Sequence, residues 1–461
     1  MTRLPMELWL NIASHYTADD RQIAQSLCLV SRSLLPLGRA LLYSNLLRKD
    51  LRKEALLNTL SNGPNAKAIA ACVREVAVEN CLCMQRVETP VNLAAVAGTG
   101  GEVIWTALDV KDAQEKVRAR WDRTVKALQF CVNIVKMTFV LDCEDAQRLI
   151  GTTTVEDEDP LELVPMPTVE SLLQLPFLPI LQSLSIYSPN DTDDTDYKPF
   201  AHLAMVCPQL TYMAFGGIEA TIFFETILQR MKDRVGHLAL STVVWDETSP
   251  RNFGPPMTFD EALIYLTDMP SVTDLTYIGP AIDYGDLQAE HHQGSVCLPS
   301  ITSLTILEQE PEHTIIRREI LRDLATYFPS LRQLAINLKH ATRYPTLGTC
   351  FPNLLSLSVT ERKGSKNGKI RLAASLLHLS TRSFAPALKR LDYRVSWGQT
   401  PSDLACQIVS AEMEMKQWAK DSVGKDLKCL RIRQGNSQRL FLRQGDHFVL
   451  LRRGASTNEL S

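Results

Sequence analysis

A short pattern, apolar-x-x-apolar-x-apolar and often preceded by a proline, recurs along most of this chain of 461 residues. From residue 181 onward, successive copies begin 23 to 39 residues apart. One such unit cannot bury its apolar face alone, so the repetition predicts a solenoid whose units stack on their neighbours. The clear copies are LPILQSLSI, CPQLTYMAF, MPSVTDLTYI, LPSITSLTIL, FPSLRQLAI, FPNLLSLSV, APALKRLDY and DLKCLRI, and the weaker copies are VREVAV, VNIVKMTF and VGHLAL.

The last two apolar positions of each copy alternate across one residue, as a strand with one buried face requires. Between copies, the stretches 221–233, 258–269 and 314–328 place apolar residues at the three- and four-residue spacing of amphipathic helices. One strand and one helix per repeat predict a parallel sheet with helices on one side. The strand residues expected to point into the core are Leu184 and Ile186, Leu275 and Tyr277, Leu304 and Ile306, Leu334 and Ile336, and Leu357 and Val359.

This organisation resembles the irregular, ribonuclease-inhibitor-like form of leucine-rich repeats, whose period is roughly 20–29 residues with insertions. The resemblance implies an α/β horseshoe over residues 71–432, with the parallel sheet concave and the helices convex. The C-terminal sequence QRLFLRQGDHFVLLRR alternates on both sides of a Gly-Asp pair. Residues 433–461 are therefore expected to form a hairpin cap followed by a loose tail.

Composition narrows the class of protein. With 45% apolar residues the chain can bury a core, and a formal charge of −3 provides no overall field that would recruit nucleic acid or an anionic membrane. The N-terminus lacks the apolar core of a signal peptide, and no apolar run is long enough to span a bilayer. The eleven cysteines, many at apolar positions, are expected to be reduced thiols. We expect a cytoplasmic or nuclear protein.

The first 46 residues form a pattern of their own. They predict three short helices, the third opened by Pro36, followed by a helical linker over 47–70. A unit this small buries little surface, so its remaining apolar residues call for a partner. An N-terminal cap that shields the first repeat is the alternative interpretation.

Residues 1–46 resemble the F-box, particularly its fungal form. The residues that carry the resemblance are Leu4, Pro5, Glu7, Ile12, Asp20, Leu27 and the stretches 29–32 and 41–43. The resemblance implies binding to a Skp-family adaptor and, through it, to a cullin. The residues it places on or behind the adaptor-binding face are Leu4, Pro5, Leu8, Ile12, Leu29, Val30 and Tyr43. Tyr43 stands where many F-boxes have tryptophan, and Ser31 where cysteine is common.

The sequence shows no catalytic constellation. The glycine-rich stretches 97–103 and 364–370 lack the pattern of a phosphate loop, and we interpret both as turns. His291 and His292, with Cys297 nearby, lack a second pair at zinc-like spacing. We therefore expect a non-catalytic protein with no metal and no cofactor.

Residues interleaved with the buried strand positions should face the concave surface, where solenoids bind partners. In the last two repeats these are Arg390, Arg394, Arg431 and Arg433, with Asp392 between the first two. Arginines on neighbouring strands can hold a carboxylate or phosphate bidentately, so we hypothesise that an acidic or phosphorylated segment of a protein substrate docks there. The alternative is an ordinary solvated charged edge.

Together these features predict the substrate-recognition subunit of a Skp/cullin/F-box ubiquitin ligase. A scaffold or binding protein that uses the F-box and repeats without promoting ubiquitylation is the alternative. The sequence does not identify the substrate.

Overall fold

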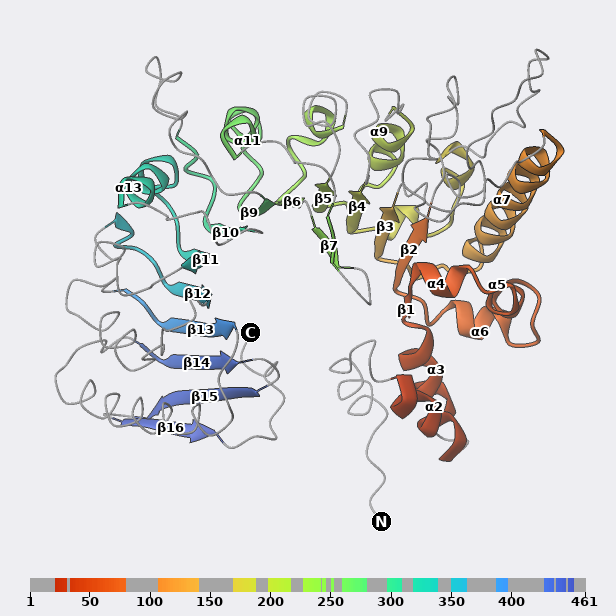
Figure 1. The fold of residues 1–461 in the computed structure, drawn as a ribbon, viewed down its shortest axis with the longest axis horizontal. Helices are drawn as coiled ribbons and strands as arrows, with labels where there is room; N and C mark the ends of the chain where they lie inside the picture. Colours follow the sequence, from red (N-terminus) through yellow and green to blue (C-terminus); the bar gives the residue numbers. More distant parts are fainter. Residues whose placement is uncertain are drawn as a thin grey trace, which may run out of the picture. The chain divides into compact units, whose positions relative to one another are not determined.

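A computed structural model describes residues 21–30, 34–79, 107–140, 169–187, 198–216, 227–241, 243–245, 250–252, 259–279, 297–308, 318–338, 350–362, 387–396, 427–434, 437–444 and 447–451 (Figure 1). The chain divides into two compact units. Unit 1 comprises residues 1–234 and 244–254, and unit 2 comprises residues 235–243 and 255–461. This division falls within the stretch of repeats.

Unit 1 contains two helices of the N-terminal segment, α2 (Arg21–Val30) and α3 (Leu35–Tyr43). They pack closely because Gly38 has no side chain: a Cβ there would lie 2.5 Å from Sγ of Cys28 and 2.9 Å from the Ala24 carbonyl oxygen. Pro36 lies in the first turn of α3, as expected. Residues 1–20, which include the first of the three predicted helices, lie outside the described residues.

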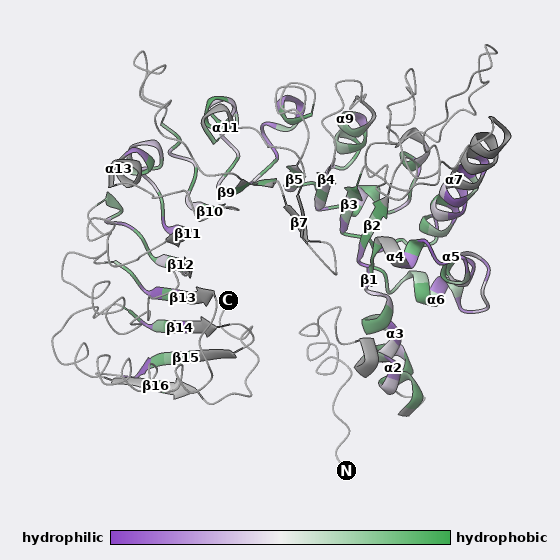
Figure 2. Ribbon diagram, in the orientation of Figure 1, coloured by the Kyte–Doolittle hydropathy of each residue, from purple (hydrophilic) through white to green (hydrophobic). Residues whose placement is uncertain are grey.

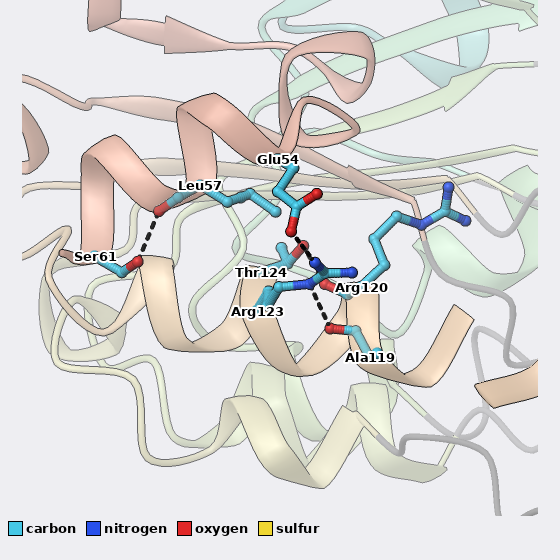
Figure 3. A network of polar contacts seen from close by, with 7 residues as sticks. All are labelled: Glu54, Leu57, Ser61, Ala119, Arg120, Arg123 and Thr124. Carbon is cyan, nitrogen blue, oxygen red and sulfur yellow. Dashed lines mark hydrogen bonds and ion pairs between the residues drawn. The ribbon is translucent and has the colours of Figure 1, made fainter. Parts of the chain in front are cut away.

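Four more helices of unit 1 follow: α4 (Arg48–Leu51), α5 (Glu54–Ser61), α6 (Ala66–Ala70) and α7 (Ala107–Leu128). Arg123 of α7 forms an ion pair with Glu54 of α5 (Figure 3). Trp121 is buried on α7, and its Nε1 donates to Oγ of Ser171 at 3.0 Å. These two contacts link α7 to α5 and to Ser171.

The sheet of unit 1 is parallel, in the order β1 (Asn45–Leu46), β2 (Glu75–Glu79), β3 (Lys136–Val140), β4 (Ser183–Tyr187) and β5 (Tyr212–Gly216). Its other elements are α9 (Lys198–Met205) and the 3-10 helices η4 (Val169–Leu172), η5 (Leu178–Ile180) and η6 (Leu228–Met231). Phe139 and Phe200 meet edge to face, with ring centroids 5.3 Å apart, and link β3 to α9 in the core.

Unit 2 continues the same design with six consecutive parallel pairings. Its parallel strands are β6 (His237–Ser241), β9 (Asp274–Gly279), β10 (Ser303–Glu308), β11 (Gln333–Leu338), β12 (Ser356–Arg362), β13 (Arg390–Ser396) and β14 (Cys429–Gln434). Helices α11 (Phe259–Leu266) and α13 (Arg318–Tyr327) lie on the outer side of its curved sheet (Figure 1). In Figure 2, hydrophobic residues recur along α11, as a core-facing helix requires.

The C-terminal hairpin predicted from the sequence is confirmed. Strands β15 (Ser437–Gln444) and β16 (His447–Leu451) pair antiparallel, with Gln444 opposite His447, so that the Gly-Asp pair lies between them. β15 also pairs antiparallel with β14 and so closes the parallel series. A separate two-stranded sheet, β7 (Val243–Trp245) with β8 (Pro250–Asn252), was not predicted.

The parallel strands β2 to β5 and β9 to β14 all begin with the same backbone arrangement, which we call a fork. Two consecutive N–H groups, the second belonging to the first strand residue, donate to one carbonyl of the preceding repeat. In unit 1, Gln182 and Ser183 donate to the carbonyl of Val135 at 2.9 and 3.1 Å. In unit 2, Lys389 and Arg390 donate to the carbonyl of Leu355 at 2.9 and 3.0 Å. Each fork fixes the register between two repeats.

The predicted core positions are confirmed: all ten of the alternating strand residues are buried, each with 2% or less of its surface exposed. The helices expected within 258–269 and 314–328 are present as α11 and α13. The stretch expected to be helical at 221–233 is described from residue 227 and contains η6. The described residues therefore form a mixed α/β fold with a mostly parallel sheet and one strand per repeat, which is consistent with a leucine-rich-repeat-like arrangement.

Candidate binding surface

The first residues of the parallel strands in unit 2 form one continuous row, which we call the fork row. Register pairings join each member to the next across neighbouring strands. Because the next residue along each strand is buried on the core side, the row faces the opposite side of the sheet. Its members are His237, Asp274, Ser303, Gln333, Ser356, Arg390 and Cys429.

A second row on the same face contains a buried ion pair. Nη1 of Arg431 lies 3.6 Å from Oδ2 of Asp392, and these side chains are only 7% and 14% exposed. The two residues are register partners on β13 and β14. The positive charge of Arg431 is therefore compensated within the sheet, which limits what it can offer to an anionic ligand.

Arg390 differs from Arg431 in this respect. It is partly exposed and, among the residues that the structure describes, has no ion-pair partner. Its neighbour in the row is Cys429, a thiol whose pKa is raised by burial even though Arg390 and Arg431 act to lower it. Arg390 is thus a described cation at this end of the sheet that is available to a ligand.

Arg394 and Arg433 are also register partners, one step further along β13 and β14. Their side chains lie outside the part of the structure that is described. The four-arginine site stays a prediction. Of its two described members, Arg431 lies beside the Asp392 carboxylate and Arg390 forms no ion pair within the described residues.

The opposite end of the fork row carries His237 and Asp274. Oγ1 of Thr273 donates to Oδ2 of Asp274 at 2.9 Å, and Nε2 of His237 lies 3.4 Å from Oγ1 of Thr276. Burial lowers the pKa of His237 more than the Asp274 carboxylate raises it, so the imidazole is neutral at pH 7. Asp274 is partly buried and forms no ion pair within the described residues.

The corresponding row in unit 1 has a different electrostatic character. There Nζ of Lys136 lies 3.5 Å from Oε2 of Glu75 on the neighbouring strand, so the two charges compensate each other. Further along, Ser185 is buried, and burial raises the pKa of Tyr187 to about 12, with a smaller contribution from Tyr212. Fixed charges without an ionic partner are thus a feature of the fork row in unit 2.

The residues assigned to adaptor binding are only partly described. Leu29 lies on α2 with 87% of its surface exposed, and Tyr43 at the end of α3 is partly buried. The side chain of Val30 is outside the described part of the structure, as are Leu4, Pro5, Leu8 and Ile12. The adaptor-binding face therefore stays a prediction from the sequence.

Asp274 was not singled out from the sequence. Its position in the repeat pattern could have identified it. Asp274 directly precedes the first buried residue of its strand, and Arg390 holds the same position in its own repeat. Aligning the copies on that position shows the charges at both ends of the row.

Among the described residues no group of three or more His, Cys, Asp or Glu side chains could hold a metal ion. None of the described helices is both long and apolar enough to cross a bilayer.

Comparison with known proteins adds little. No protein-family model matches this chain, and no curated protein does. One matching solved structure is the crystal structure of a TLR13–ssRNA13 complex, at 10% sequence identity and a TM-score of 0.28. The match covers 66% of this chain and 40% of that one. A likeness this weak carries no inference about ligand or function, so the fold assignment rests on the repeated strands and forks.

Proposed function

We propose that this chain is the substrate-recognition subunit of a Skp/cullin/F-box ubiquitin ligase. The observation that carries the proposal is the exposed Leu29, which lies on α2 within the segment that resembles an F-box. A leucine with 87% of its surface in water is little packed in the isolated chain, and its position in the segment that resembles an F-box, rather than its exposure alone, supports contact with a partner. Contact with an adaptor would remove that apolar surface from water.

The repeats supply the second half of the proposed function. An open sheet face on a stack of repeats is a typical protein-binding surface. The proposed ligand at its C-terminal end is an acidic or phosphorylated segment of a substrate, held by Arg390 with Arg394, Arg431 and Arg433 in support. The chain itself would perform no chemistry, because the ubiquitin transfer would be carried out by other subunits.

Replacing Leu29 with aspartate is expected to weaken binding to the Skp-family adaptor at least about tenfold, because a charge would be buried in an apolar interface without a partner. Co-purification and calorimetric titration with the adaptor measure the effect. The matched control is Val132→Asp, which places the same charge on another exposed apolar residue of unit 1, 48% exposed, and should leave adaptor binding unchanged.

Leu8→Asp and Ile12→Asp extend the test to the first segment of the resemblance. Adaptor binding that survives all three substitutions would exclude the proposed interface. The scaffold alternative makes a different prediction: the adaptor would still co-purify, but the cullin would not, and substrate levels would not respond to proteasome inhibition.

A further inference from the structure

Two charged residues of the fork row lack an ionic partner within the described residues: Asp274 on β9 and Arg390 on β13. Both are partly withdrawn from water. A partly desolvated charge is costly unless an opposite charge compensates it. The nearby Asp392 cannot fully compensate the charge of Arg390, because Arg431 already lies 3.6 Å from the Asp392 carboxylate. Each end of the row therefore favours a ligand group of opposite charge.

Polar residues occupy the row between these ends. Ser303, Gln333 and Ser356 are the intervening members, and all three are at least partly exposed. Two are small, so they leave room for a backbone to approach, and all three can donate and accept hydrogen bonds. A polar chain lying across the strands would find partners along this whole path.

The distance between the two charges sets the size of the ligand. Four register pairings separate Asp274 from Arg390. At ~4.8 Å per strand this is ~19 Å along the sheet. An extended peptide advances ~3.3 Å per residue, so about six residues cover that span.

We infer that the fork row of unit 2 binds an extended peptide that crosses β9 to β13, with a basic side chain at Asp274 and an acidic group about six residues away at Arg390. The acidic group is a carboxylate or a phosphate, since a guanidinium binds both. The inference rests on the proposed receptor function for the origin of the peptide, which would be a segment of the substrate. It names the charge pattern that such a substrate would carry.

The purified full-length chain, without any adaptor, is titrated into a fluorescein-labelled peptide whose polarisation is recorded. The peptide has one lysine and, six positions later, one phosphoserine on a serine–glycine background. We expect Arg390→Glu and Asp274→Lys each to weaken binding about tenfold. Moving the two charges to within two positions of each other should weaken binding to a similar extent. A glutamate in place of the phosphoserine tests whether a carboxylate suffices.

Matched controls change the same charges at exposed positions outside the row. Lys389→Glu lies next to Arg390, and Asp268→Lys lies in the loop after α11. Both should bind the peptide like the unchanged chain, and so should Leu29→Asp, whose adaptor binding is lost if the proposed function holds. Thermal melts of Arg390→Glu and Asp274→Lys that match the unchanged chain show that the fold is intact. Equal binding by these two variants, or by the short-spaced peptide, would overturn the inference.

Discussion

Replacing Phe259 with alanine is expected to lower the free energy of unfolding of unit 2 by about 3–5 kcal/mol. Phe259 is buried at the start of α11, and its ring centroid lies 5.2 Å from that of Tyr277 on β9 and 6.5 Å from that of Phe328. One ring thus joins α11 to the sheet and to Phe328, which directly follows α13. Its removal leaves a cavity lined by two aromatic rings and also removes two edge-to-face contacts.

Urea denaturation followed by circular dichroism measures this loss. The matched control is Ile264→Ala on the same helix, because 44% of that side chain is already exposed. It should cost well under about 1 kcal/mol, since little buried surface is removed. Comparable losses for the two variants would show that α11 is not anchored to the sheet through its aromatic face.

The second large effect is expected at the buried ion pair. Asp392→Ala removes the carboxylate that lies 3.6 Å from the buried guanidinium of Arg431, and breaking such a pair from one side costs about 3–5 kcal/mol. The pair of substitutions Asp392→Leu and Arg431→Met removes both charges and keeps apolar volume in place. That double variant should be close to the unchanged chain in stability, because paired desolvation roughly offsets Coulomb attraction.

The same denaturation experiment separates the two outcomes. Asp268→Ala, an exposed acidic residue of unit 2, is the control for loss of one negative charge and should be within about 0.5 kcal/mol of the unchanged chain. If the single and double variants were equally destabilised, packing rather than charge compensation would explain the contribution of these two residues to stability.

The sequence predicted the sheet well because period-two alternation depends on local burial. Leu304 and Ile306 are buried on β10 as expected, and the same alternation placed weaker copies such as β3 and β6 correctly. It did not predict α7. Ten of its 22 residues are charged, and the buried residues that are described, such as Trp121 and Leu128, lie in its C-terminal half. A helix with this many charged residues gives a weak apolar periodicity.

The binding surface was harder to predict than the fold. The sequence identified Arg390 and Arg431 as equivalent concave arginines, but ion-pair geometry depends on which cross-strand neighbours share a register. Asp392 lies 3.6 Å from Arg431, whereas Arg390 forms no ion pair within the described residues, and this difference exists only once β13 and β14 are paired. Charges such as Asp274, many residues away along the chain, enter the same row only through the stacking of repeats.

The spacing of the fork row also sets which residues of a bound extended peptide would meet its side chains. Strands repeat every ~4.8 Å across the sheet, whereas an extended peptide repeats every ~3.3 Å, so two strand steps match about three residues. Asp274, Gln333 and Arg390 lie on alternate strands and would meet ligand residues i, i+3 and i+6. Ser303 and Ser356 would lie opposite the stretches of peptide backbone between these ligand residues. Selectivity is then expected at every third ligand residue, while the residues between can vary freely.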